Sequence, residues 1–179
     1  RDLLKTYVDC GGTMLDTSHY YGSFLVGGRS LSECLVGDFL QENHLREQVL
    51  ISTKGCCYAT NKPYEKRMTP AFLRSDLTES LRNLHTDYID FYWLHQDDPS
   101  QPVGAILEEL NRCVEEGKIR YFGCSNWKIE RILEADAYAE AHGLRKFSAN
   151  QVMLNMAYPN MTAVDELIQT WLTPGMRKY

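Results

Sequence analysis

The sequence has no strongly basic segment, no long apolar run and no paired metal-ligand spacing, and each absence excludes a class of protein. Its 179 residues carry a formal net charge of −5, whereas binding to a nucleic acid duplex needs a basic protein face. No apolar run approaches the roughly 20 residues of a membrane-spanning helix. The five histidines show no HExxH pattern. We therefore expect no nucleic-acid partner, no membrane span and no metal site.

The six cysteines form no CxxC pair and no spacing typical of a disulfide framework. Reduced thiols in a cytoplasmic protein are therefore expected. Hydrophobic residues make up 44% of the chain, which is sufficient for one sizeable core.

Five short segments rich in β-branched and aromatic residues predict strands. They are nearly continuous in apolar character, which is typical of strands buried on both faces of a parallel sheet. The segments are residues 13–16, 48–54, 87–95, 118–126 and 147–154.

The stretches between these strands carry the signals of helix ends. Ser30 and Glu33 form a capping box at the start of one helix. Thr69 is a typical N-cap residue, and Pro70 follows it at the first helical position. Two further predicted helices end at a glycine, the residue favoured in a left-handed C-cap. The remaining helices are predicted over residues 1–9, 102–117 and 128–143 and after residue 162.

Strand–helix units that repeat along the chain predict parallel α/β structure, either an open doubly wound sheet or a closed barrel. No GxGxxG or Walker-type loop follows any predicted strand, which argues against a dinucleotide-binding open sheet. A (β/α)8 TIM barrel needs about 250 residues, and only five strand candidates are present. We expect one barrel domain over residues 1–179, with about five βα units and incomplete at both ends.

Polar groups that can do chemistry lie at the carboxyl ends of these strands. They are Asp16, Lys54, His95, Ser125–Asn126 and Gln151, in chain order. Taken alone, a lysine there could simply solvate a strand end, and a histidine could be a buried structural residue. In a parallel barrel, however, all these ends open onto the face that carries the active site. The combined pattern favours the barrel and an enzyme.

Five motifs, in the order LDTSHYYG, ISTKG, IDFYWLH, GCSN and NQV, together resemble the aldo-keto reductases. The resemblance covers nearly the whole chain. It implies a (β/α)8 barrel that binds NADPH in an extended form and reduces small aldehydes or ketones to alcohols. It leaves the carbonyl substrate, the preference for NADPH over NADH and the oligomeric state open.

The resemblance also implies which residues form the site. The implied catalytic residues are Asp16, Tyr21, Lys54 and His95. The implied cofactor contacts are Asp16, Ser125, Asn126 and Gln151. Tyr21 is chosen over Tyr20 because the tyrosine of the family stands five residues after the aspartate and directly before a glycine. We expect Tyr20 to be a packing residue.

The chemistry of carbonyl reduction explains these residue types. Hydride arriving at a carbonyl carbon leaves an alkoxide that needs a proton, and a phenol with a pKa near 10 is a poor donor. We expect the Lys54 ammonium to lower the pKa of Tyr21 and Asp16 to hold Lys54 in place. His95 is expected to donate a hydrogen bond to the carbonyl oxygen.

The sequence also allows two alternative interpretations. Tyr58 and Lys62 match the YxxxK pair of short-chain dehydrogenases, but Pro63 after Lys62 predicts a loop there instead of the helix that this pair needs. The alternative function is a regulatory or binding protein that keeps the reductase fold, as the ion-channel β subunits of this family do. Trp93 and Trp127 are candidates for either pocket lining or core packing.

Overall fold

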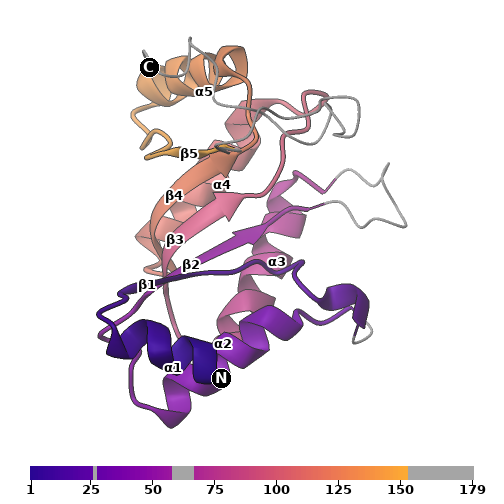
Figure 1. The fold of residues 1–179 in the computed structure, drawn as a ribbon. Coiled ribbons are helices and arrows are strands. Elements are labelled where there is room, and N and C mark those ends of the chain that lie inside the picture. The colour runs from indigo at the N-terminus through magenta and orange to yellow at the C-terminus, as the bar shows by residue number, and fades with distance from the viewer. Residues whose placement is uncertain (26–27, 58–66, 153–179) are drawn as a thin grey trace, which may run out of the picture.

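The computed structural model describes residues 1–25, 28–57 and 67–152. Within them, five parallel strands form one sheet in the order β1-β2-β3-β4-β5 (Figure 1). The strands are β1 (Met14–Asp16), β2 (Leu50–Gly55), β3 (Ile89–Leu94), β4 (Ile119–Ser125) and β5 (Asn150–Gln151). A doubly wound sheet reverses its strand order, whereas a barrel adds each strand beside the previous one. The predicted barrel class is confirmed, and the five strands form part of a TIM barrel.

One helix precedes β1, and the helices that follow connect successive strands and pack on one another in chain order. They are α1 (Asp2–Asp9), α2 (Leu31–Glu42), α3 (Pro70–Asn83), α4 (Val103–Glu115) and α5 (Ile129–His142), with a short 3-10 helix η1 (Ser23–Leu25). Contacts run from α2 to α3, from α3 to α4 and from α4 to α5. Figure 1 shows α1 and α2 near β1 at one end of the sheet, and α5 near β5 at the other.

The predicted helix caps are confirmed, except that the capping box forms by its Ser30 half: the Glu33 carboxylate instead accepts from the Thr53 hydroxyl at 2.7 Å and the Asn83 side-chain amide at 3.1 Å. The Ser30 side chain accepts a hydrogen bond from the Glu33 backbone N–H at 3.2 Å, and Thr69 caps α3 in the same way. Gly143 ends α5 with a φ of 66°, and Gly117 follows α4 with a φ of 72°. Both angles are in the left-handed region that favours glycine.

The strand bounds differ from the prediction mainly at β5. Among the described residues, this strand pairs with β4 through Asn150 and Gln151, whereas a strand over residues 147–154 was predicted. Residues 147–149 precede the paired segment, although the Ser148 backbone N–H still donates to the carbonyl of Phe122 at 2.9 Å. Residues 153–154, the helix predicted after residue 162 and the Tyr58–Lys62 pair lie outside the described residues.

The alternation of side chains along β2 separates the core from the site. Ile51 is fully buried, and the Thr53 hydroxyl donates to a Glu33 carboxylate oxygen of α2 at 2.7 Å. This face of the strand therefore packs on the helices. Because successive side chains point to opposite faces, Ser52 and Lys54 lie on the face turned away from them.

The two tryptophans in question belong to packed regions of the protein. Trp127 is fully buried within the hydrophobic core cluster. Trp93 is 7% exposed and stacks on Phe91, with the ring centroids 4.2 Å apart. The core-packing interpretation therefore holds for Trp127, whereas Trp93 is buried outside the core cluster and its indole N–H donates to Ser52 at 2.8 Å. The six cysteines all lie in described residues and form no disulfide. No helix in the described ranges has the length and apolar character needed to cross a membrane.

Candidate active site

A cavity of about 360 Å³ lies at the carboxyl ends of the strands. All seven residues singled out from the sequence line it, although they come from five different strands or the segments that follow them. The lining consists of Asp16, Tyr21, Lys54, His95, Ser125, Asn126, Gln151 and Val152. Val152 was not selected from the sequence, although it is the last residue of the NQV motif.

Lys54 is held in place at the end of β2. Its side chain is 2% exposed, and Nζ donates to Asp16 Oδ2 at 2.5 Å and to the Thr17 carbonyl at 2.8 Å. Asp16 Oδ1 accepts from the Ser52 hydroxyl at 2.6 Å, and Ser52 Oγ in turn accepts from Trp93 Nε1 at 2.8 Å. The pairing of Asp16 with Ser52 across β1 and β2 places these groups together. Burial lowers the pKa of Lys54, while the hydrogen bond and charge of Asp16 oppose that change.

Tyr21 lies beside the lysine on the segment that follows β1. Its ring centroid is 5.1 Å from Lys54 Nζ and 5.7 Å from the His95 ring, which it meets edge to face. Gly22 adopts a φ of 75°, and a Cβ there would lie 2.9 Å from Leu31 Cβ. The glycine after the tyrosine is therefore needed for both the turn and the close approach of α2.

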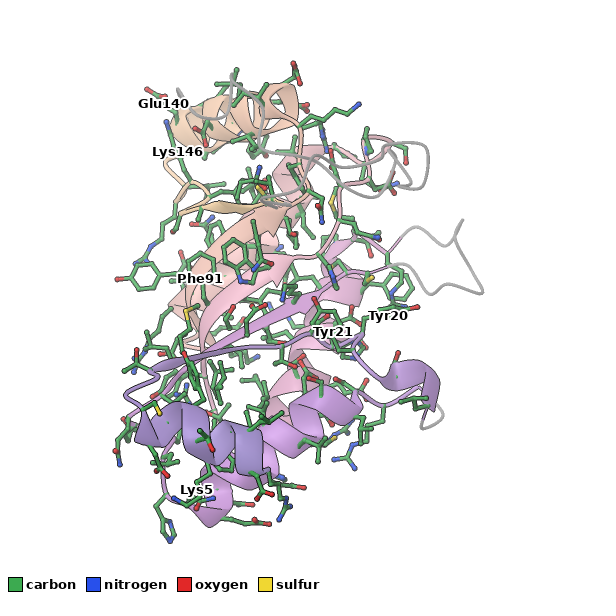
Figure 2. All side chains as sticks on the ribbon, in the orientation of Figure 1. Lys5, Tyr20, Tyr21, Phe91, Glu140 and Lys146 are labelled. Carbon is green, nitrogen blue, oxygen red and sulfur yellow. The ribbon has the colours of Figure 1, made fainter. Side chains whose placement is uncertain are left out.

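The two adjacent tyrosines have different positions relative to the cavity. Figure 2 shows both on the segment between β1 and η1. Tyr21 lines the cavity, whereas Tyr20 is not part of the lining formed by the described residues. The geometry thus agrees with the choice of Tyr21 from the sequence.

The predicted lowering of the Tyr21 pKa is wrong. Burial raises the pKa of Tyr21, and the negative charge of Asp16 and the neighbouring Cys57 raise it further. The main physical reason is the partial burial of the phenol, which disfavours the charged phenolate, and the carboxylate of Asp16, which pairs with Lys54, adds to this effect. At neutral pH the Tyr21 hydroxyl therefore keeps its proton.

His95 follows β3 and is fixed by hydrogen bonds to its backbone and its ring. Its backbone N–H donates to the Gly55 carbonyl at 2.9 Å, and Nδ1 lies 3.0 Å from Ser18 Oγ. Burial, followed by the positive charge of Lys54, lowers the pKa of His95 to about 4. The imidazole is therefore neutral at physiological pH.

This pKa predicts a loss of stability on acidification. The folded value of about 4 lies below the ordinary value of 6.5, so between these two pH values the unfolded chain binds a proton that the folded chain does not. As the pH is lowered from 6.5 to about 4, the free energy of unfolding should decrease by about 3 kcal/mol in total. Above pH 6.5, His95 should make no further contribution to the pH dependence of stability. Urea unfolding of the wild type and His95→Gln between pH 7 and 4 measures this. An equal pH dependence in both proteins would contradict the prediction.

Ser125, Asn126 and Gln151 form the opposite wall of the cavity. The Gln151 carbonyl accepts from Ser125 Oγ at 2.9 Å and from the Asn126 backbone N–H at 3.0 Å. Asn126 Nδ2 donates to Ser125 Oγ at 3.1 Å, and Asn126 has a left-handed φ of 62°. Within the described part of the chain, the side-chain amide of Gln151 makes no hydrogen bond, although it lines the cavity. This wall can therefore offer an amide donor and an amide acceptor to a ligand.

A sequence profile of the Aldo/keto reductase family matches residues 1–177. The chain belongs to this family. It is 31% identical over 157 residues to norsolorinic acid reductase of Aspergillus flavus, covering 84% of this chain and 39% of that protein. It is 31% identical over 144 residues to aldo-keto reductase YhdN of Bacillus subtilis, covering 80% of this chain and 42% of that protein. The chain thus spans about two fifths of the length of these relatives.

Two solved structures of Klebsiella pneumoniae aldo-keto reductases share the fold. One, in complex with NADPH, has a TM-score of 0.67 and 30% identity, and covers 84% of this chain and 46% of that chain. The other, in complex with NADP and acetate, has a TM-score of 0.70 and 28% identity, and covers 90% of this chain and 50% of that chain. The strand order and these similarities together assign the described strands to an aldo-keto reductase barrel.

Proposed function

We propose that the protein reduces an aldehyde or ketone to an alcohol with hydride from NADPH. The observation that carries this proposal is the convergence of Asp16, Tyr21, Lys54 and His95 on one cavity. These side chains supply a proton donor, a paired cation and a neutral hydrogen-bond donor within one site. We further propose that residues 1–179 belong to a single barrel domain.

The chemistry of the opposite wall fits the carboxamide of a nicotinamide. A primary carboxamide carries both donors and an acceptor, and so does the Gln151 side chain, which has no partner among the described residues. Ser125 and Asn126 lie beside it. We propose that these three residues hold the carboxamide, and that Asp16 adds a contact from β1. Similarity to proteins solved with NADPH and with NADP supports this choice of cofactor.

The proposed roles follow from the proton and charge that each side chain carries. The bound cofactor supplies a hydride to the carbonyl carbon. The Tyr21 hydroxyl gives its proton to the oxygen, which completes the alcohol. The Lys54 ammonium stabilises the phenolate that this transfer leaves, and Asp16 holds Lys54. His95 donates a hydrogen bond to the oxygen and orients it. Proton transfer of this kind is typically worth about 10²–10⁴-fold in rate.

The test is a reductase assay on the purified protein. Incubation with NADPH and a panel of small aliphatic and aromatic aldehydes should lower the absorbance of the reduced cofactor and yield the matching alcohols. Binding of NADPH without turnover of any aldehyde or ketone would instead favour the regulatory, non-catalytic alternative. Fluorescence titration of NADPH separates these two outcomes.

A further inference from the structure

A serine that the proposed mechanism does not use contacts the ring of His95. Ser18 is fully buried, and its Oγ lies 3.0 Å from His95 Nδ1. The contact joins the segment after β1 to the segment after β3, which are 77 residues apart in the sequence. Sequence motifs alone could not reveal it.

The surroundings of the hydroxyl determine where its proton goes. Ser18 Oγ accepts a hydrogen bond from the Tyr20 backbone N–H at 3.1 Å, which occupies one lone pair. Its proton then has two possible acceptors, His95 Nδ1 at 3.0 Å and the Lys54 carbonyl at 3.4 Å. The carbonyl already accepts from the His19 backbone N–H at 2.9 Å. Distance and the existing bond both favour His95 Nδ1 as the acceptor.

We propose that Ser18 is a positioning residue for His95: its hydroxyl donates to Nδ1 and thereby holds the imidazole in the tautomer that carries its proton on Nε2. Nε2 makes no hydrogen bond to any described residue, and His95 lines the cavity. The tautomer therefore makes a hydrogen-bond donor available to a substrate oxygen. The structural part of this inference stands by itself, and only its effect on rate rests on the proposed reductase function.

The charge state of the ring makes the tautomer decisive. Burial and the Lys54 charge lower the pKa of His95 to about 4, so at pH 7 the ring is neutral and carries a single proton. A neutral imidazole can donate from one nitrogen only, and the bond made by the other nitrogen selects which one. Without the Ser18 hydroxyl, the proton could reside on Nδ1, and Nε2 would then become an acceptor that repels a carbonyl oxygen.

The primary experiment is ¹⁵N NMR of the histidine side chains in the protein at pH 7, without cofactor or substrate. Loss of signals in His95→Gln assigns the His95 resonances. We expect wild-type His95 to show a protonated Nε2 and an unprotonated Nδ1. In Ser18→Ala this preference should be lost, with both tautomers populated. In Ser18→Cys, which keeps a weaker donor, the preference should be intermediate.

Ser32→Ala is the matched control. Ser32 Oγ contacts Thr17 Oγ1 at 2.7 Å, so this variant removes a hydroxyl from the same region without touching His95. It should leave the tautomer unchanged. A wild-type His95 protonated on Nδ1, or an unchanged tautomer in both Ser18 variants, would overturn the proposal.

Kinetics provide the second readout. Ser18→Ala should lower kcat for aldehyde reduction about tenfold, the effect of one lost hydrogen bond, while Ser32→Ala stays near the wild-type value. A protein without reductase activity that still shows the tautomer shift in Ser18→Ala would refute the proposed function and retain the positioning role. An active enzyme in which Ser18→Ala leaves the His95 tautomer unchanged would support the proposed function and refute the positioning role.

Discussion

Replacing Tyr21 by phenylalanine is expected to slow carbonyl reduction by about 10²–10⁴-fold, because the variant lacks the proposed proton donor. The ring, its edge contact with His95 and its position beside Lys54 are all compatible with phenylalanine. The loss should therefore appear in kcat, with little change in the affinity for NADPH. Steady-state kinetics with an aldehyde identified in the assay, together with fluorescence titration of NADPH, measure both quantities.

Tyr20→Phe is the matched control for this substitution. It removes the same hydroxyl from the adjacent residue, and Tyr20 is absent from the described lining of the cavity. Its kcat should stay within a few-fold of wild type. If Tyr20→Phe lost more activity than Tyr21→Phe, the assignment of the proton donor would be wrong.

Much of the site could be predicted because the backbone pattern alone places it. Parallel strands in one sheet bring their carboxyl ends to one edge, so Asp16, Lys54 and His95 had to approach one another once each was assigned to a strand end. The resemblance to the family, whose tyrosine stands five residues after the aspartate and directly before a glycine, then distinguished Tyr21 from Tyr20. No tertiary information was needed for either step.

Contacts across strands could not be predicted in this way. Ser52 orients Asp16 through the register of β1 and β2, and Ser18 reaches His95 across 77 positions. Serine is common in turns and strand ends, so neither residue carries a signal in the sequence. The start of β5 at Asn150, instead of at residue 147, was missed for a similar reason, because pairing with β4 sets it and local β propensity does not.

The pKa of Tyr21 was predicted in the wrong direction because sequence reasoning counted one partner charge. The structure adds two effects that the sequence does not contain, partial burial of the phenol and the nearby Asp16 carboxylate. Burial acts in opposite directions on the two proposed donors, raising the pKa of Tyr21 and lowering that of His95. Both side chains are consequently neutral at physiological pH. Each then carries one proton that it can donate to a carbonyl oxygen.

Replacing Lys54 by methionine should therefore act on the transition state and not on the protonation of resting Tyr21. Methionine fills a similar volume but cannot stabilise the phenolate that forms as the proton leaves. We expect kcat to fall by about 10²–10³-fold. The pKa of His95 should also rise from about 4, because the Lys54 charge is one of the causes that lower it. Asp16 is 41% exposed, so water can solvate its carboxylate after the ammonium is removed, and the variant should fold.

The pH titration of His95 by NMR separates this electrostatic role from a merely structural one. Lys5→Met is the control, since Lys5 is an exposed lysine on α1 that pairs with Asp9 (Figure 2). It removes the same charge from the protein while leaving the cavity intact, so kcat and the His95 titration should match the wild type. A folded Lys54→Met protein with wild-type kcat and an unshifted His95 titration would contradict the proposed role. Removal of a charged ammonium from this site must raise the pKa of His95, because it ends the repulsion between the ammonium and the imidazolium. A lowered kcat with an unshifted His95 titration would therefore show that Lys54 contributes packing and not charge.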